Sequence, residues 1–333
     1  MIEGRSHITV PARICLAGEG CDWMLSKAAC WSFPATEMTA EIQANRTASD
    51  YDVTIDYLGF GRAEMLSAEA LSDVRDTHLS YGAACLLAFR NRLATSPRGL
   101  LIRLTSTIPT CGGFSSSAAL CVALVKAMAS ASGVRLGEEA VAEIAWDAEQ
   151  LMKIPCGRMD QYSVQSPEPI VIDSSVTPPA ITPLTLPGSV AIVAAYRAEI
   201  SCSFAEQYPD VRRRWQEGEE NVLRYVHEIA QTCETLVDAS LNQALDARVL
   251  GEAVMRAHMA IVEYLGTRNT EIDALVDVAQ RAGALGAKSC GARQRGGTMI
   301  AVCESGRAET VARALSDMQA SVIVHRYGDE EYT

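Results

Sequence analysis

The sequence predicts an α+β protein built from two domains, and three observations lead to that prediction. The chain has 333 residues, which corresponds to about two domains of ordinary size. Segments with strand-like alternation are interleaved with segments of helical periodicity along the chain. A connector over residues 167–189 carries six prolines, which exclude helix interiors and central strands. We therefore place the domains at residues 7–187 and 188–333.

The first domain is predicted to combine a sheet with three helices. Apolar residues that alternate with other residues, between turn-forming residues, indicate strands over 8–16, 37–43, 50–58 and 100–106. Apolar residues at helical spacing predict helices over 67–93, 115–131 and 137–152. The connector that follows is expected to hold at most short edge strands.

The second domain is predicted to repeat this mixture with more helix. Strands are expected over 190–196, 298–304 and 321–327, and helices over most of 204–282 and over 307–320. This alternation favours sheets that helices cover on one face, which is an α+β arrangement.

Composition excludes several classes of function. The formal net charge is −12 and basic residues form no long run, so binding to nucleic acid through its phosphates is not expected. No apolar stretch approaches the roughly 20 residues that span a bilayer. Eleven scattered cysteines without a CxxC pair indicate reduced thiols in a cytoplasmic protein. The five histidines form no HExxH motif, which argues against a protein-built zinc site.

Residues 108–124, IPTCGGFSSSAALCVAL, lie between a predicted strand and a predicted helix. Gly112 and Gly113 allow a tight turn and a close approach of the backbone to a ligand. The first turn of the helix offers unpaired N–H groups to phosphate oxygens, and Ser115–Ser117 add hydroxyls. A plain serine N-cap explains the same residues equally well. A Walker A loop is excluded because no lysine follows the glycines.

Two further glycine-rich segments carry polar side chains. In PARICLAGEGCDW, residues 11–23, the carboxylates of Glu19 and Asp22 follow a strand and suit recognition of sugar hydroxyls, although a solvated turn is the alternative. In GAKSCGARQRGGTMIAV, residues 286–302, a loop with one lysine and two arginines precedes a strand. This loop is either a connection with a glycine C-cap or a flexible segment that closes over a phosphate-bearing substrate.

The order and content of these three segments resemble the GHMP kinases, the superfamily of galactokinase, homoserine kinase, mevalonate kinase and phosphomevalonate kinase. The first motif is matched at Pro11, Arg13, Leu16, Gly18, Glu19 and Asp22. The second is matched at Pro109, Gly113, Phe114, Ser115, Ser116, Ser117 and Ala118. The third is matched in part at Gly291, Ala292, Gly296 and Gly297. The resemblance implies an N-terminal α/β domain like domain 2 of ribosomal protein S5 and a C-terminal ferredoxin-like α+β domain.

A fourth segment narrows the resemblance. CGRMDQYSV, residues 156–164, is similar to the G-x-M-D-Q segment of galactokinases and the D-Q segment of heptose kinases. Asp160 falls at the position of their catalytic aspartate, which homoserine kinases lack. Glu149 resembles the magnesium-ligating glutamate of the superfamily. The chain departs from the galactokinase pattern at Gly20, where histidine is usual, and at Arg293, where glycine is usual.

The resemblance also implies a role for each of these residues. Asp160 and Arg13 would be catalytic, and Ser117 and Glu149 would ligate Mg²⁺. ATP phosphates would be held by Pro109, Gly112, Gly113, Phe114, Ser115, Ser116, Ser117 and Ala118. The acceptor would be held by Glu19, Gly20, Asp22, Gly291, Arg293 and Arg295.

The function that the resemblance implies is transfer of the ATP γ-phosphate to a sugar, most simply at the anomeric hydroxyl, which gives a sugar 1-phosphate. If Arg293 and Arg295 bind substrate, they indicate an acidic or already phosphorylated sugar. The alternative is that they are a solvent-facing pair. Two alternatives stay open. They are a non-catalytic sugar and ATP sensor, and a mevalonate-pathway enzyme. We expect small-molecule partners only, no membrane, and a monomer or homodimer.

Overall fold

The computed structural model describes residues 6–44, 52–58, 61–67, 69, 71, 79–109, 113–186, 190–197, 204–266, 268–291 and 297–327. The chain divides into two compact units, each assembled from three segments. Unit 1 comprises Met1–Ala12, Thr36–Ile108 and Ser115–Gln165, and unit 2 comprises Arg13–Ala35, Pro109–Phe114 and Ser166–Thr333. The boundary predicted at residue 187 lies outside the described residues and stays a prediction.

The sheet of unit 1 has the strand order β4-β3-β5-β2. Its strands are β2 (Lys27–Ala44), β3 (Val53–Tyr57), β4 (Arg62–Leu66) and β5 (Leu100–Ser106). Strand β5 runs parallel to β3 and antiparallel to β2. Strand β1 (Ser6–Ala17) pairs with β2, and both strands continue along the chain from one unit into the other.

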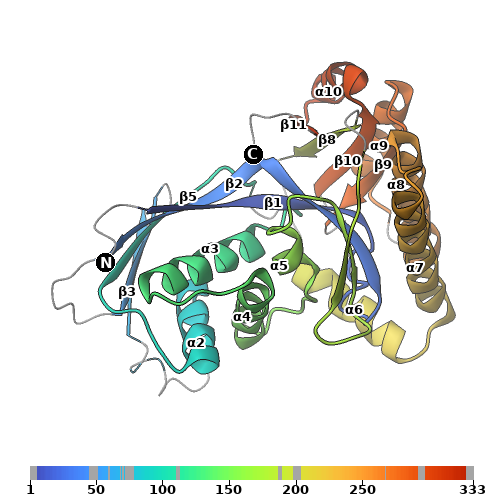
Figure 1. Ribbon diagram of the computed structural model, residues 1–333. Coiled ribbons are helices and arrows are strands. Elements are labelled where there is room, and N and C mark those ends of the chain that lie inside the picture. The colour runs from blue at the N-terminus through green and yellow to red at the C-terminus, as the bar shows by residue number, and fades with distance from the viewer. Residues whose placement is uncertain are drawn as a thin grey trace. The chain divides into compact units, whose positions relative to one another are not determined.

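Three helices of unit 1, α2 (Tyr81–Leu93), α3 (Ser116–Ala131) and α4 (Glu138–Leu151), pack against one another. They lie on one side of the sheet strands in Figure 1. Helix α3 is rich in alanine and is buried along most of its length, because small side chains let its neighbours approach closely. A short helix, α5 (Met159–Ser163), carries Asp160 and packs on α3 and α4.

The third segment of unit 2, Ser166–Thr333, begins with the proline-rich connector. Its two short strands, β6 (Ile170–Asp173) and β7 (Ala180–Pro183), continue from the Lys27–Cys30 part of β2, and β7 is the edge strand. The expectation of short edge strands is confirmed for β7. Strand β6 lies between two others, and its backbone forms pairs on both sides because no proline interrupts it.

The second sheet of unit 2 is antiparallel, with the order β11-β8-β10-β9. Its strands are β8 (Val190–Arg197), β9 (Gly286–Cys290), β10 (Gly297–Glu304) and β11 (Ser321–Arg326). The helices are α6 (Phe204–Gln216), α7 (Glu220–Leu241), α8 (Ala247–Ala260), the π-helical turn Ile261–Leu265, α9 (Thr270–Arg281), the 3₁₀ turn Ser305–Arg307 and α10 (Ala308–Asp317).

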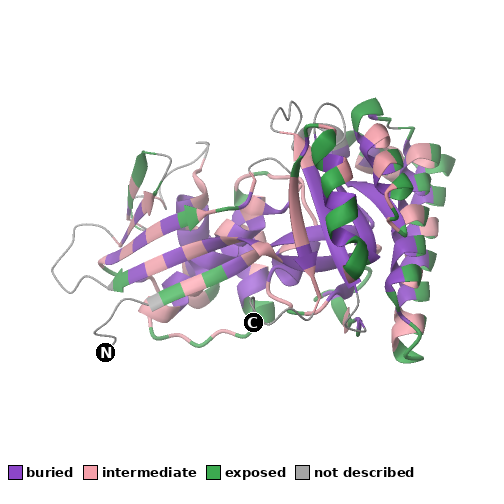
Figure 2. Ribbon diagram, turned by 90° about the horizontal axis from the view of Figure 1, so that it is seen from above, coloured by how far each residue is buried: buried purple, intermediate pink, exposed green. Residues whose placement is uncertain are grey.

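The core of this part forms where α9 and α10 cover one face of the second sheet. Alternate strand residues such as Val193 and Ala301 meet Leu275 of α9 and Leu315 of α10, all fully buried. Strands β8, β9 and β10 are largely buried and the edge strand β11 is partly exposed, whereas the helices keep exposed outer faces (Figure 2). This is the amphipathic pattern that the helical periodicity predicts.

The α+β class is confirmed, and most predicted elements match the structure. Two differ. Within the expected helix over 67–93, residues 69, 71 and 81–93 (α2) are helical, the intervening residues 72–78 lie outside the described part of the chain, and strand β4, directly before this segment, was not predicted. Residues 286–290 form buried strand β9, where a loop was expected, because the small residues of GAKSC can pair with β10. No described helix is long and apolar enough to cross a membrane.

Candidate active site

The amino end of α3 is built from the serine segment. Ser115 adopts a left-handed backbone with φ 57° and makes no side-chain capping bond, so the interpretation as a serine N-cap is wrong. The first helical bond runs from Ala119 N to Ser115 O over 3.0 Å, which leaves the preceding amides without a partner within the helix. The Ser115 hydroxyl is buried and has no hydrogen-bond partner in the described structure. Unsatisfied donors at a helix amino end are what an anionic group binds.

Gly113, two residues before Ser115, has φ +74° and lies against the segment that follows β9. A Cβ on Gly113 would lie 2.6 Å from the carbonyl oxygen of Cys290, and a Cβ on Gly291 would lie 2.7 Å from the Gly113 Cα. Both glycines are therefore required for close backbone contact within unit 2. The second and third motifs meet here. Phe114, the next residue, stacks on Phe33 with ring centres 5.9 Å apart.

Glu149, at the end of α4, forms the polar centre of unit 1. Its side chain is 2% exposed and accepts hydrogen bonds from Gln161 of α5 and from the Ser117 hydroxyl of α3. The Cys156 thiol donates to Glu149 Oε2 over 3.6 Å. Burial, and next the charge of Asp160, raise the pKa of Glu149 to about 7, although the hydrogen bonds oppose this rise. The structure therefore brings Ser117, Glu149 and Asp160 together.

The residues at this centre fit a magnesium ion that is bound with a nucleotide. An ionised carboxylate in this buried position is costly without a cation, as its raised pKa indicates. No group of three metal-binding side chains occurs among the described residues. One or two carboxylates with a hydroxyl are instead typical of Mg²⁺ that takes its remaining ligands from phosphates and water.

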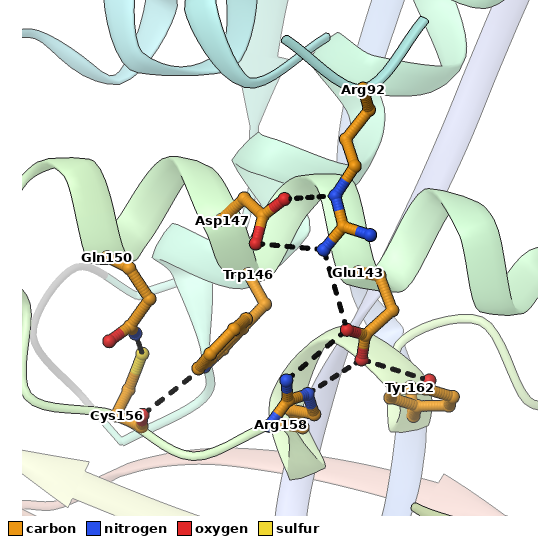
Figure 3. Close-up of polar contacts among 8 residues, drawn as sticks. All are labelled: Arg92, Glu143, Trp146, Asp147, Gln150, Cys156, Arg158 and Tyr162. Atoms are coloured by element: carbon orange, nitrogen blue, oxygen red, sulfur yellow. Dashed lines mark hydrogen bonds and ion pairs between the residues drawn. The ribbon is translucent and has the colours of Figure 1, made fainter. Parts of the chain in front are cut away.

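The segment that leads to Asp160 is fixed to α4 by Arg158 (Figure 3). The Arg158 guanidinium donates to both oxygens of Glu143, over 2.7 and 3.3 Å, and stacks on Trp146 at 3.6 Å from the ring centre. The Tyr162 hydroxyl donates to Glu143 Oε1 over 3.2 Å. We call Glu143, Trp146, Arg158 and Tyr162 the Arg158 cluster. It joins α4 to both sides of Asp160.

Two further contacts in Figure 3 hold the start of the same segment. Trp146 Nε1 donates to the carbonyl oxygen of Cys156 over 3.4 Å, and Gln150 Nε2 donates to the Cys156 sulfur over 3.4 Å. At the outer end, Arg92 of α2 donates to both oxygens of Asp147, over 2.5 and 3.2 Å. Arg92 is half exposed and also forms an ion pair with Glu143 Oε2 over 3.9 Å, so it contacts the Arg158 cluster (Figure 3).

Arg13 of the first motif is buried in unit 2. Its Nη1 donates to the carbonyl oxygen of Gly113 over 3.3 Å, and its amide donates to Phe114 O over 3.1 Å. The first and second motifs are therefore connected directly. Asp160 belongs to unit 1, so the catalytic pairing of Arg13 with Asp160 stays a prediction.

Glu19 forms a buried ion pair that the sequence did not predict. Lys288 of β9 donates to Glu19 Oε1 and, over 3.0 Å, to the carbonyl oxygen of Cys15. Burial, the largest single effect, would lower the pKa of Lys288, but the Glu19 charge, the neighbouring thiols of Cys15 and Cys290 and the hydrogen bond to Glu19 together raise it. Glu19 Oε2 is buried without a hydrogen-bond partner in the described part of the chain. A solvated turn is thus wrong for Glu19, and one of its oxygens is already committed to Lys288.

The other predicted acceptor residues lie in the same turn or outside the described structure. Gly20 has φ +76° and accepts from Met24 N over 3.1 Å, and Asp22 is 5% exposed. Gly291 borders Gly113, as described above, and Pro109 is half-buried in unit 2. Gly112, Arg293 and Arg295 lie outside the described residues. Ser116 and Ala118 belong to the first turn of α3.

Three side chains at these sites were not predicted from the sequence. Gln161 and Arg158 flank Asp160 in the quoted segment, but their partners on α4 are more than ten residues away. Lys288 was noted only as one basic residue of a supposed loop. The segment GAKSC around it is too short to show a strand-like alternation, so the sequence carried no clear signal for a buried strand there.

Comparison with known proteins identifies the family. The model of the GHMP kinases N terminal domain matches residues 79–166, and that of the GHMP kinases C terminal domain matches residues 238–320. The chain belongs to the GHMP kinase superfamily. Members of this superfamily use ATP and Mg²⁺ and act on an alcohol group, so this is an ATP-dependent phosphotransferase.

The relatives divide between two substrate classes. A galactokinase of Thermococcus kodakarensis is 24% identical over 67% of this chain and 70% of its own length. A mevalonate kinase of Thermococcus onnurineus is 28% identical over 76% of this chain and 74% of its own. Most of the other named sequence relatives are mevalonate kinases. The crystal structure of Methanococcus jannaschii mevalonate kinase shares the fold, with a TM-score of 0.79, 16% identity, and coverage of 98% of this chain and 99% of its own.

Proposed function

We propose that this kinase uses the Ser117, Glu149 and Asp160 side chains to transfer the γ-phosphoryl group of ATP to a hydroxyl of a small polar molecule. The observation that carries the proposal is the buried Glu149 carboxylate, which is hydrogen-bonded to Ser117 and whose pKa is raised to about 7 by burial and, to a lesser extent, by the charge of Asp160. A buried carboxylate beside a second carboxylate is costly unless a cation or a proton neutralises it.

The residues of this site have separate roles in the proposal. The amides at the amino end of α3 and the Ser115 hydroxyl bind phosphate oxygens. Ser117 and Glu149 hold Mg²⁺, which neutralises charge on the phosphates when it is bound. Asp160 orients the attacking hydroxyl and accepts its proton. Such a site needs alignment and charge neutralisation more than covalent chemistry, because the transferred group passes through a loose transition state.

For the acceptor, a mevalonate-type hydroxy acid is the first candidate. It is supported by the relatives, most of which are named mevalonate kinases. This is the alternative that the sequence left open, and it has more support than the sugar that the sequence favoured.

A sugar is the second candidate, with the anomeric hydroxyl as the attacking group and a sugar 1-phosphate as the product. Two specific observations favour it. The G-x-M-D-Q segment around Asp160 resembles that of galactokinases, and Asp22 places a buried carboxylate next to Gly20, where it suits a polyol. A galactokinase is also among the relatives.

A non-catalytic sensor on the same fold is the remaining alternative. Ser117, Glu149 and Asp160 are all present and adjacent in unit 1, which supports catalysis over sensing alone. A sensor has no need for a carboxylate placed beside a magnesium site.

The test is an ADP-release assay with ATP·Mg²⁺ and a panel of mevalonate, phosphomevalonate, galactose, galacturonate and heptose phosphates. Product NMR then locates the new phosphate. Turnover of mevalonate with phosphate at its primary hydroxyl supports the first candidate, and a sugar 1-phosphate supports the second. ATP binding without turnover of any acceptor would leave the sensor as the function.

A further inference from the structure

Three consecutive arginines on α6, at positions 212, 213 and 214, differ in their partners. Arg213 pairs with Asp210 and Glu217 over 2.7 and 2.6 Å. Arg214 pairs with Glu219 over 2.5 Å. Arg212 forms no ion pair among the described residues, although it is less exposed than Arg213. The helix thus holds one guanidinium that lacks an acid.

Arg212 lies instead on an aromatic ring within unit 2. Its Cζ is 4.3 Å from the centre of the Trp23 ring, which is the geometry of a cation–π contact. Its Nε is buried and has no hydrogen-bond partner in the described structure. Burial lowers the pKa of the Arg212 guanidinium, and no described carboxylate offsets that effect. Since arginine stays protonated in proteins, a positive charge is held here, and its Nε–H makes no hydrogen bond in the described structure.

Trp23 belongs to the turn that carries the predicted acceptor residues. Asp22 precedes it directly, and Glu19 is four positions earlier. Helix α7 fixes this turn, because the Tyr225 hydroxyl donates to the carbonyl oxygen of Glu19 over 3.1 Å. The Glu19 charge is neutralised by Lys288. The Arg212 guanidinium therefore lies on the turn that carries Glu19 and Asp22, and the Glu19 carboxylate of that turn is already paired with Lys288.

We propose that Arg212, held on Trp23, binds an anionic group of the phosphoryl acceptor, either a carboxylate or a phosphate monoester. The flat face of the guanidinium covers the indole, which leaves its N–H edge for a bidentate contact. Stacking fixes the side chain before the ligand arrives, so less rotamer freedom is lost on binding. Of the three α6 arginines, Arg212 is the one without an ion pair among the described residues, because Arg213 and Arg214 are paired with acids.

This inference rests on the proposed function and sharpens it. An acidic acceptor, such as a mevalonate-type acid, a uronic acid or a sugar phosphate, satisfies Arg212. A neutral sugar leaves a partly buried guanidinium without an anion, and the binding site then discriminates against it. The charge at position 212 is thus a selectivity element for charged over neutral acceptors.

The test is isothermal titration of the full-length protein with mevalonate, galacturonate, galactose 6-phosphate and neutral galactose. We expect at least one anion to bind at least about 10-fold more tightly than galactose, since a hydrogen bond to a charged group contributes about 1.5–3 kcal/mol. Mevalonate and galacturonate test whether Arg212 binds a carboxylate, and galactose 6-phosphate tests whether it binds a phosphate. Arg212→Met is expected to weaken the binding of the anion by about 10–100-fold. Arg212→Lys keeps the positive charge but cannot form the bidentate contact of a guanidinium. Its affinity for the anion should lie between those of the wild type and of Arg212→Met.

Arg213→Met is the matched control, because Arg213 is exposed and paired with acids of its own helix. It should change the affinity by less than about twofold. ATP·Mg²⁺ binding, measured on every variant, reports that the fold is retained, and Arg212→Lys carries the test if Arg212→Met does not fold. Equal binding of galactose and the anions, no binding of any anion, or equal losses in the 212 and 213 variants would overturn the proposal.

The kinase assay separates this proposal from the proposed function. If the wild type phosphorylates an acceptor and the 212 variants leave its KM unchanged, the anion site is wrong and the kinase function stands. If no acceptor of the panel is phosphorylated but anion binding depends on Arg212, the binding site stands and the catalytic proposal fails.

Discussion

The guanidinium of Arg158 lies 3.6 Å from the centre of the Trp146 ring and donates to both carboxylate oxygens of Glu143. Through this contact the residue two positions before Asp160 is fixed to the helix that carries Glu149. The separation of the two carboxylates proposed for catalysis is therefore set by a structure around Arg158 rather than by α5 alone, which is only five residues long.

Replacing Arg158 should impair turnover more than ATP binding. Arg158→Met removes the bidentate bond, so we expect kcat to fall by about 10–100-fold as Asp160 loses alignment, with the KM for ATP nearly unchanged. Arg158→Lys should recover part of the rate. Arg248→Met, which removes an exposed pair with Glu252 on α8, serves as the control. Equal rates in the 158 and 248 methionine variants would show that the Arg158 cluster does not position Asp160.

The raised pKa of Glu149 predicts a pH dependence of stability in the absence of Mg²⁺. Because the folded-state pKa of about 7 lies above the ordinary value of 4.5, folding favours the protonated acid. The stability gained from the protonated form is complete below the ordinary value and is lost as pH rises through about 7, by on the order of 3 kcal/mol. Glu149→Gln should remove this slope. Urea denaturation in EDTA at pH 5 and pH 8 measures it, and identical slopes in variant and wild type would contradict the assignment.

Asp160→Asn tests the role of the second carboxylate. If Asp160 accepts the proton of the attacking hydroxyl, kcat should fall by roughly 10²–10⁴-fold, the usual range for loss of a general base. Asp277→Asn removes an exposed carboxylate of α9 and should leave the rate unchanged. Steady-state ADP release measures both variants, and thermal melting confirms that they fold. Near-native turnover in a folded Asp160→Asn variant would exclude the acid–base role.

Breaking the buried pair between Lys288 and Glu19 should destabilise the protein. Lys288→Met leaves the Glu19 carboxylate buried without its cation, which costs about 3–5 kcal/mol. The double variant Lys288→Met/Glu19→Gln should regain most of that loss, because no buried charge remains. The raised pKa of Lys288 means that the pair is intact at neutral pH and is lost only as pH rises through that raised value. Urea denaturation midpoints of the wild type, Lys288→Met and the double variant measure these stabilities. A double variant no more stable than Lys288→Met would refute the explanation by an unpaired buried charge.

Much of the fold was predictable because local periodicity reports which face of an element is buried. The predicted strand over 100–106 coincides with β5, and the helices predicted over 115–131 and 137–152 match α3 and α4 within one residue at each end. The order of the three glycine-rich segments identified the superfamily, since each motif is a short stretch of chain. Strand β9 was missed because GAKSC is too short and too rich in small residues to show alternation.

The sequence by itself determined the α+β class, most helices and strands, the superfamily, and Ser117, Glu149 and Asp160 as candidate residues. Only the tertiary structure decided how these residues are supported. It leaves the hydroxyl of Ser115 without a capping bond, pairs Glu19 with Lys288 across 269 positions of sequence, and places Arg212 on Trp23 without an ion pair among the described residues. The reason is physical: periodicity encodes burial over a few residues, whereas the partner of a buried charge depends on which distant segments the folded chain brings together.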